Sequence, residues 1–339
     1  MYQPKYRITP YLLNLIGEAS ALRSWIEEAS LKVAWLPIIQ RESRAKAAHS
    51  STAIEGNPLT LSQVEAVDRG EPVGVPQEYE MEVANYLKVM RWIGKYARSP
   101  MKVPAILKLH KILMRNLMND EKCGKYKDKQ NYVIDEKKIR IYTPPSPKQT
   151  PGLVKDLVNW LNLPETKKLH SILVCSILHH RLVSIHPFSD GNGRIARALG
   201  TWSLYQQGFD THHIFSLDDF FAGNRKRYYQ KIQQARELDN DLTYWIEYVT
   251  EGIIKTLEEV KRRIETLQVS TRFKGSLSRR QEELVRILRD NPAIGVSELQ
   301  KNLKLTRARI NQIIAPLMKK GFIVKEGKSR ATRYKLASF

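Results

Sequence analysis

Residues 186–197 read HPFSDGNGRIAR and constrain the chain more than any other stretch. The apolar residues 168–185 before them and residues 194–207 after them have helical spacing, so the stretch is predicted to link two helices. Its two glycines would let the backbone approach an anion closely and leave amide N–H groups free to bind it. A helix N-terminus also attracts negative charge. The sequence therefore predicts a loop that binds a polyphosphate.

The charged side chains of this stretch suit the same ligand. Arg194 and Arg197 are three residues apart, so a helix places them on one face, and guanidinium groups match phosphate oxygens. Asp190 supplies the hard oxygen ligand that Mg²⁺ prefers. His186 is the side chain here that can accept a proton near neutral pH. A polar surface turn would not need all of these groups together.

With every defined position matched, residues 186–197 resemble the signature of Fic-domain proteins, His-Pro-Phe-x-Asp/Glu-Gly-Asn-Gly-Arg-x-x-Arg. The resemblance implies a protein adenylyltransferase that uses ATP and Mg²⁺. Such an enzyme moves AMP onto a Ser, Thr or Tyr hydroxyl of a target protein and releases pyrophosphate. The resemblance makes His186 the base and Asp190 the Mg²⁺ ligand, while Phe188 is expected to anchor the loop in the core. It assigns the phosphate contacts to Gly191, Asn192, Gly193, Arg194 and Arg197.

A second motif lies upstream, where residues 51–56 read STAIEG. It matches the inhibitory pattern Ser/Thr-x-x-x-Glu-Gly/Asn that accompanies many Fic domains. Ser51 and Glu55 are four residues apart and would share one helix face, with Gly56 ending the helix. The resemblance implies that Glu55 forms a salt bridge with Arg197, takes the place of the γ-phosphate and so inhibits the enzyme. A solvated glutamate at a helix end is the alternative interpretation.

Two short β-rich runs, 131–134 and 139–143, flank a charged turn at 135–138 and predict a hairpin. This hairpin resembles the Fic flap, which clamps an extended segment of the target by strand pairing next to the histidine. Just before the hairpin, the chain has Lys127 where many relatives carry an arginine. The change loses the bidentate geometry of a guanidinium group.

A weaker pattern further along the chain concerns the adenine base of ATP. Asn224 and Tyr229 match a downstream pattern that lines the adenine pocket in Fic proteins, so the resemblance implies the same role here. Tyr228 belongs to the same pattern, and the alternative interpretation is that it packs its helix.

Composition limits the remaining classes of function. The chain has no run of 18 apolar residues, which argues against a transmembrane helix, and its N-terminus lacks the apolar core of a signal peptide. A cytoplasmic location is therefore expected, without a membrane partner. Cys123 and Cys175 do not form a disulfide framework. The neighbouring His179 and His180 would point in different directions on a helix, which argues against a zinc site.

The net charge of +21 suggests an acidic partner, and the charge is uneven. Residues 271–339 carry 17 Lys/Arg against 5 Asp/Glu, an excess of 12 positive charges. Helical stretches near 279–290, 296–302 and 306–320, followed by two short strands around a basic turn, resemble a winged helix-turn-helix. The third helix carries residue types that read DNA bases, and the turn carries residue types that bind phosphates. These are Arg307, Arg309 and Asn311 on the helix and Lys325, Lys328, Arg330 and Arg333 on the wing. A winged helix used for protein contact or dimerisation is the alternative.

Together these features predict a mainly α fold: a Fic-type helical domain with a small β-hairpin flap, and a C-terminal winged helix. The predicted domains are an N-terminal helical region with the inhibitory helix at 1–95, the catalytic domain at 96–268 and the winged helix at 279–339, after a linker at 269–278. Further helices are expected at 11–49 with a break near Pro37, 76–97, 103–117, 151–162, 216–237 and 240–268.

The predicted function is AMP transfer from ATP to a protein hydroxyl, held back by Glu55. Two alternatives stay open. One is a DNA-binding transcription regulator whose Fic domain senses nucleotide. The other is a Fic-type enzyme that removes AMP or transfers another phosphate-containing group. Modification of the chain by itself and a homodimer are left open too.

Overall fold

The computed structural model describes residues 2–29, 35–134, 139–210, 212–272, 277–291, 293–319, 321–327 and 332–336. They belong to two compact units, Met1–Val260 and Lys261–Phe339. The predicted hairpin turn at 135–138 and the predicted wing residues Lys328 and Arg330 lie outside the described residues, as do residues 273–276 of the predicted linker. The predicted division of the first unit near residue 95 stays a prediction.

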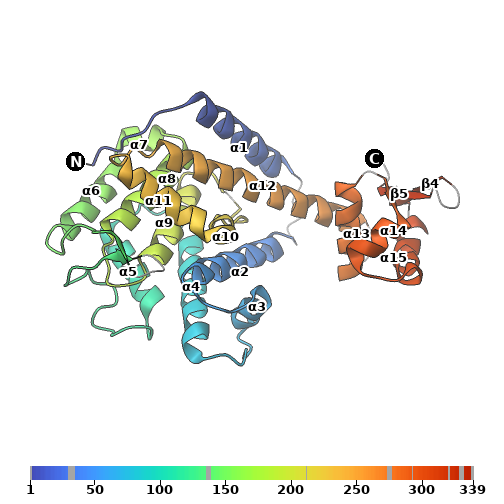
Figure 1. Ribbon diagram of the computed structural model, residues 1–339, viewed down its shortest axis with the longest axis horizontal. Helices are drawn as coiled ribbons and strands as arrows, with labels where there is room; N and C mark the ends of the chain where they lie inside the picture. Colours follow the sequence, from blue (N-terminus) through green and yellow to red (C-terminus); the bar gives the residue numbers. More distant parts are fainter. Residues whose placement is uncertain are drawn as a thin grey trace. The chain divides into compact units, whose positions relative to one another are not determined.

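The first unit is built almost entirely from helices, as predicted (Figure 1). In chain order they are α1 (Pro10–Glu28), α2 (Leu36–Ile54), α3 (Leu61–Arg69), α4 (Gln77–Lys95), α5 (Val103–Met114), α6 (Thr150–Asn162), α7 (Pro164–Lys168), α8 (Ser171–Ile185), α9 (Asn192–Gln206), α10 (Asp218–Gly223) and α11 (Arg225–Glu237). The long α12 (Thr243–Arg272) begins in this unit and ends beyond its boundary. No helix in the described part of the chain is long and apolar enough to cross a membrane.

Helices α8 and α9 form the centre of the first unit and pack side by side. Nearly every residue of both is buried, which agrees with the many apolar residues of α8. Gly200 of α9 faces Cys175 of α8, where an added Cβ would lie 3.4 Å from the sulfur, so the small residue lets the two helices approach closely. The loop between them is therefore attached to two deeply buried helices.

Two of the predicted helices differ in their boundaries from the sequence prediction. The expected helix 216–237 is two helices, because Asn224 leaves the helical conformation and its side-chain oxygen accepts the Arg227 N–H at 2.9 Å, which caps α11. Helix α12 continues to Arg272, four residues into the predicted linker. The break near Pro37 is present, with the proline in the first turn of α2. Helices α3 and α7 were not predicted.

The flap is a short antiparallel pair, β1 (Val133–Ile134) and β2 (Arg140–Tyr142), in which Val133 faces Tyr142. Both strands are shorter than the predicted runs. The isoleucine side chains Ile134 and Ile139 are more than half exposed. The hydroxyl of Tyr142 donates to the Ser184 carbonyl at 3.0 Å, which ties the flap to the end of α8.

The second unit is a winged helix, as predicted. Three helices, α13 (Arg279–Asp290), α14 (Val296–Leu303) and α15 (Arg307–Lys319), accompany strands β3 (Ile294–Gly295), β4 (Ile323–Glu326) and β5 (Arg333–Leu336). The strands form an antiparallel sheet in the order β3-β5-β4. Strand β3, which pairs with β5, was not predicted from the sequence. The core of this unit is formed by apolar side chains of all three helices, including Leu284, Leu299, Ile310 and Leu317.

Candidate active site

The loop between α8 and α9 begins at a sharp turn of the backbone. His186 follows α8 in the left-handed conformation, with φ of 51°, and its N–H still donates to the Leu182 carbonyl at 2.9 Å. Pro187 has no N–H, so it cannot continue the helix. The loop ends at Gly191, which has φ of 75°, and α9 begins at Asn192, two residues earlier than predicted. The first N–H groups of α9 therefore line the loop.

The loop is held from inside the protein by Phe188 and Asn192. Phe188 is fully buried, as expected of an anchor, and its ring stacks on the His110 ring with centroids 3.8 Å apart. The Asn192 side chain accepts the Phe188 N–H at 2.9 Å and donates to the Phe188 carbonyl at 2.8 Å. This amide is occupied in shaping the loop, so a phosphate contact from Asn192 would use its backbone N–H.

His110 of α5 supports the loop in a way that the sequence did not reveal. Its Nδ1 accepts the Gly124 N–H at 2.9 Å, and its Nε2 lies 3.1 Å from the Asp190 carbonyl. A carbonyl only accepts, so Nε2 carries the proton and the ring is neutral. Burial lowers the pKa of His110 to about 4. A histidine among apolar residues of a helix gives no signal that distinguishes this role from ordinary packing.

Among the described residues, one hydrogen bond orients the His186 ring. Its Nδ1 lies 3.3 Å from the Val183 carbonyl, so Nδ1 carries the proton and Nε2 keeps its lone pair. The pKa of His186 is lowered to about 4, with burial as the largest cause and the cations of Lys127 and Arg236 acting in the same direction. The imidazole is therefore neutral at pH 7 and able to accept a proton at Nε2.

Arg197 of α9 is buried and surrounded by acceptors. Its Nη2 donates to Glu55 at 2.7 Å and to the Ser51 carbonyl at 2.9 Å, and its Nε donates to the Ser51 hydroxyl at 2.7 Å. The salt bridge that the resemblance implied is therefore present. Asp218 lies 3.4 Å from the same guanidinium group and was not predicted, because its position depends on the packing of α10 against α2.

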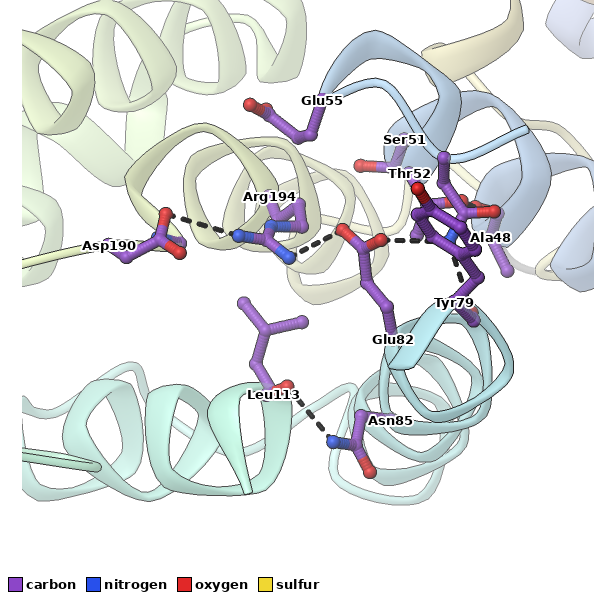
Figure 2. A network of polar contacts seen from close by, with 12 residues as sticks. Ala48, Ser51, Thr52, Glu55, Tyr79, Glu82, Asn85, Leu113, Asp190 and Arg194 are labelled. Carbon is purple, nitrogen blue, oxygen red and sulfur yellow. Dashed lines mark hydrogen bonds and ion pairs between the residues drawn. The ribbon is translucent and has the colours of Figure 1, made fainter. Parts of the chain in front are cut away.

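Arg194 also binds carboxylates, although the sequence predicted no partner for it. Its Nη1 donates to Glu82 of α4 at 2.5 Å and its Nη2 to Asp190 at 3.2 Å, and Figure 2 shows both contacts. The second oxygen of Glu82 accepts from the Asn57 side chain at 2.8 Å, two residues after Glu55. Glu82 thus connects the turn after α2 with the first arginine of α9.

Gly193 is a glycine because Glu55 lies against it. A Cβ at this position would come within 2.6 Å of the Glu55 carboxylate and 3.1 Å of the Arg197 guanidinium. Any side chain here would therefore push against the carboxylate that holds Arg197. The glycine keeps the start of α9 open to an anion of similar size.

The Asp190 carboxylate fits a magnesium ligand in exposure and chemistry. Its side chain is 65% exposed, and one of its oxygens accepts from Gly191 N and Arg194. No group of three His, Cys, Asp or Glu residues that could hold a metal ion occurs in the described part of the chain. Mg²⁺ commonly relies on one or two carboxylates together with substrate phosphates. Asp190 would therefore hold the ion only together with a bound nucleotide.

The residues predicted for the adenine pocket lie on α11 and at its N-terminus. Tyr228 is buried, its hydroxyl lies 2.9 Å from His179 Nε2, and it packs in the core as the alternative interpretation expected. Tyr229 is 36% exposed, with the Arg225 guanidinium 5.5 Å from its ring. Asn224 is exposed and caps α11. An adenine site at Asn224 and Tyr229 stays a prediction.

Two family models match the chain, and their ranges agree with the fold. Residues 100–204 match the model of the Fic/DOC family. Residues 100–204 form a Fic/DOC domain. Residues 277–329 match the model of the MarR family, so the second unit contains a MarR-family winged helix. The Fic domain includes α5, both buried central helices and the loop that joins them.

The chain is similar to named proteins in sequence and to solved structures in fold. The chain is similar to the protein adenylyltransferase Fic of Nematostella vectensis, with 29% identity over 217 residues that cover 62% of this chain and 47% of that protein. It spans about half the length of the curated relatives it matches. A Fic family protein from Desulfovibrio desulfuricans G20 has a TM-score of 0.69 at 25% identity, with 100% of this chain and 99% of that chain covered. Fic-1 from C. elegans has a TM-score of 0.64 at 25% identity, with 75% and 73% covered.

Acid pH is expected to destabilise the Fic domain through His110. Its pKa of about 4 lies below the ordinary 6.5, so the unfolded chain binds this proton more readily. The contribution of His110 to the free energy of unfolding is therefore fully present above about pH 6.5 and is lost as the pH falls toward about 4. This loss amounts to about 3 kcal/mol. Urea unfolding at about pH 7 and about pH 4 measures it.

The matched comparison is His110→Gln, which removes the titrating group. This variant should lose part of its stability at neutral pH and show a flatter dependence on pH than the unmodified chain. If His110→Gln keeps the full dependence, His110 is not the neutral acceptor described above.

Proposed function

We propose that the chain transfers AMP from ATP to a hydroxyl group of a protein. The observation that carries the proposal is the convergence of three features on one loop. These are a histidine with a free Nε2 lone pair, a glycine-rich backbone at a helix N-terminus, and two buried arginines. The relatives named protein adenylyltransferase support the same reaction.

In the proposed reaction, His186 Nε2 takes the proton of the target hydroxyl as its oxygen attacks the α-phosphorus of ATP. A new oxygen–phosphorus bond forms, and the bond between the α-phosphorus and the bridging oxygen breaks and releases pyrophosphate. The N–H groups at the start of α9 and the guanidinium groups of Arg194 and Arg197 stabilise charge on the phosphates. Asp190 would hold Mg²⁺, which supplies further charge neutralisation when it is bound. The exposed flap edge suits pairing with an extended segment of the target.

We also propose that Glu55 inhibits this reaction. Its carboxylate lies 2.7 Å from Arg197 and against Gly193, where the terminal phosphate of ATP would otherwise bind. A carboxylate and a phosphate compete for the same guanidinium group, because both bind through paired oxygens. The nucleotide would then bind in a pose that does not align its α-phosphorus with His186.

Glu55→Gly is therefore expected to raise AMP transfer, visible as incorporation of label from α-labelled ATP into the chain itself. Arg197 loses its competing carboxylate and becomes available for the phosphate. Glu18→Gly, an exposed glutamate within α1, is the matched control for a lost charge and a glycine in a helix, and it should behave like the unmodified chain.

Equal or lower incorporation by Glu55→Gly would count against inhibition by Glu55. If the variant instead loses the ability to remove AMP from modified protein, Glu55 serves hydrolysis, and the reverse reaction becomes the better assignment.

His186→Ala, made in the Glu55→Gly chain, is expected to lower transfer by about 10²–10⁴-fold while nucleotide binding is retained. The base is lost, whereas the phosphate-binding groups remain. His212→Ala is the control. With His186 present, the rate should change little between about pH 6 and about pH 8, because its pKa lies near 4. Equal label incorporation with and without His186 would exclude it as the base.

We propose a second function for the winged helix, namely DNA binding, which would make the chain a regulator of transcription that senses nucleotide. The excess of positive charge in residues 271–339 and the match to the MarR family support it. Arg307, Arg309 and Asn311 are exposed at the start of α15, the position of a recognition helix. Lys325 and Arg333 are exposed on the wing strands.

Arg309→Ala should weaken binding to a specific DNA site by roughly 1–3 kcal/mol, because a base contact is lost. Lys325→Ala should weaken binding to all sequences alike and reduce its dependence on salt. Fluorescence anisotropy with labelled duplexes from low to physiological salt measures both effects. No binding of the full chain at low salt would leave dimerisation or target docking as the role of this domain.

A further inference from the structure

Arg236, in the last turn of α11, binds the end of α8 beside His186. Its Nη2 donates to the Val183 carbonyl at 3.1 Å and its Nε to the Ser184 hydroxyl at 3.2 Å. The Val183 carbonyl is the same oxygen that accepts from His186 Nδ1 at 3.3 Å. One acceptor is thus shared between the proposed base and a cation from another helix.

The end of α8 has carbonyls that need donors. In a continuous helix the Val183 carbonyl would accept the N–H of residue 187, but residue 187 is a proline. The Ser184 carbonyl would accept the Phe188 N–H, which donates to Asn192 instead. A cation at a helix C-terminus also interacts favourably with the helix dipole. Arg236 therefore supplies a hydrogen-bond donor and a positive charge at this helix end, where the backbone N–H donors are missing.

The same guanidinium group connects this helix end with the flap. Its central carbon lies 3.8 Å from the centre of the Tyr142 ring, a close cation–π contact with strand β2. The Tyr142 hydroxyl donates to the Ser184 carbonyl at 3.0 Å. Arg236 and Tyr142 thus form a joint cap that holds the flap, the last turn of α8 and the base together.

Arg236 has no carboxylate within salt-bridge distance among the described residues, although it is partly buried. Its remaining side-chain contact is with Gln233, one turn earlier on α11, at 3.4 Å. An unpaired cation in this position is costly unless its donors are satisfied. Every contact that satisfies them lies at the end of α8, on the flap or on its own helix.

We propose that Arg236 is a positioning residue for His186: together with Tyr142 it holds the Val183 carbonyl and the flap so that the imidazole keeps Nε2 directed at the acceptor hydroxyl. The inference rests on the function proposed above. It assigns no contact between Arg236 and the nucleotide or the target.

The charges around His186 give this role a second readout. Lys127, on the segment before the flap, and Arg236 both favour the neutral imidazole, whereas Glu55 of α2 favours the protonated form. Removing the Arg236 charge should therefore raise the pKa of His186 from about 4 toward the ordinary 6.5. Lys127 remains, and burial alone lowers its own pKa to about 8.

The test compares Arg236→Gln and Arg236→Lys in the full Glu55→Gly chain. Both variants should lower kcat by about 10- to 10²-fold, because neither side chain can bridge two α8 acceptors and cover the Tyr142 ring, and the KM for ATP should not change. NMR titration of the His186 ring, assigned by its loss in His186→Ala, should show a raised pKa in Arg236→Gln. Arg236→Lys should keep the pKa low, since the charge remains.

Two further variants separate positioning from folding. Arg227→Gln, on the same helix but paired with Glu251 on the surface, should leave kcat and the His186 titration unchanged. Tyr142→Phe keeps the ring and loses the hydroxyl, so it should lower kcat less than Arg236→Gln while leaving the titration in place. A change in thermal unfolding that accompanied the kcat loss in every variant alike would overturn a specific role.

Unchanged kcat and an unchanged His186 titration in Arg236→Gln would also overturn the proposal. If the Glu55→Gly chain transfers no AMP at all, the proposed function fails, and the NMR titration still decides whether Arg236 controls His186.

Discussion

A helix that is buried on all sides must end inside the protein, and the end of α8 is the constraint on which the site depends. The last carbonyls of any helix lack N–H partners, and Pro187 removes one more donor at this end. Those carbonyls are then shared among His186, Arg236 and Tyr142, which come from the loop, from α11 and from the flap. The groups around the proposed base are therefore held in place by hydrogen bonds to these carbonyls.

Arg194 and Arg197 of α9 are donors that need acceptors. Each is nearly buried, and a buried cation needs a counter-charge. The first unit supplies Glu82 to Arg194 and Glu55 with Asp218 to Arg197. Under the proposed function, a nucleotide would compete with these carboxylates for the two guanidinium groups. Asn57 donates a hydrogen bond to Glu82 from the turn that follows Glu55.

Much of the loop could be predicted from residue types in order. The glycines, the arginines three residues apart and the histidine before a proline are local features, and they predicted the phosphate loop. The contact between Glu55 and Arg197 was implied only by the resemblance to Fic proteins. The helices around the loop followed from apolar spacing. The boundary inside 216–237 could not be predicted this way, because it depends on whether the Asn224 side chain caps a new helix or remains in the old one.

The sequence by itself determined which groups are available at the loop, because chemistry and helical spacing are properties of neighbouring residues. Only the tertiary structure decided which partners face them. Some of these partners lie far along the chain from the residues they contact, and others belong to helices with other evident roles. They are Glu82, His110, Asp218 and Arg236. Their positions follow from how α4, α5 and α11 pack against the two central helices and from how α10 packs against α2. Such packing depends on the shape of whole helix faces.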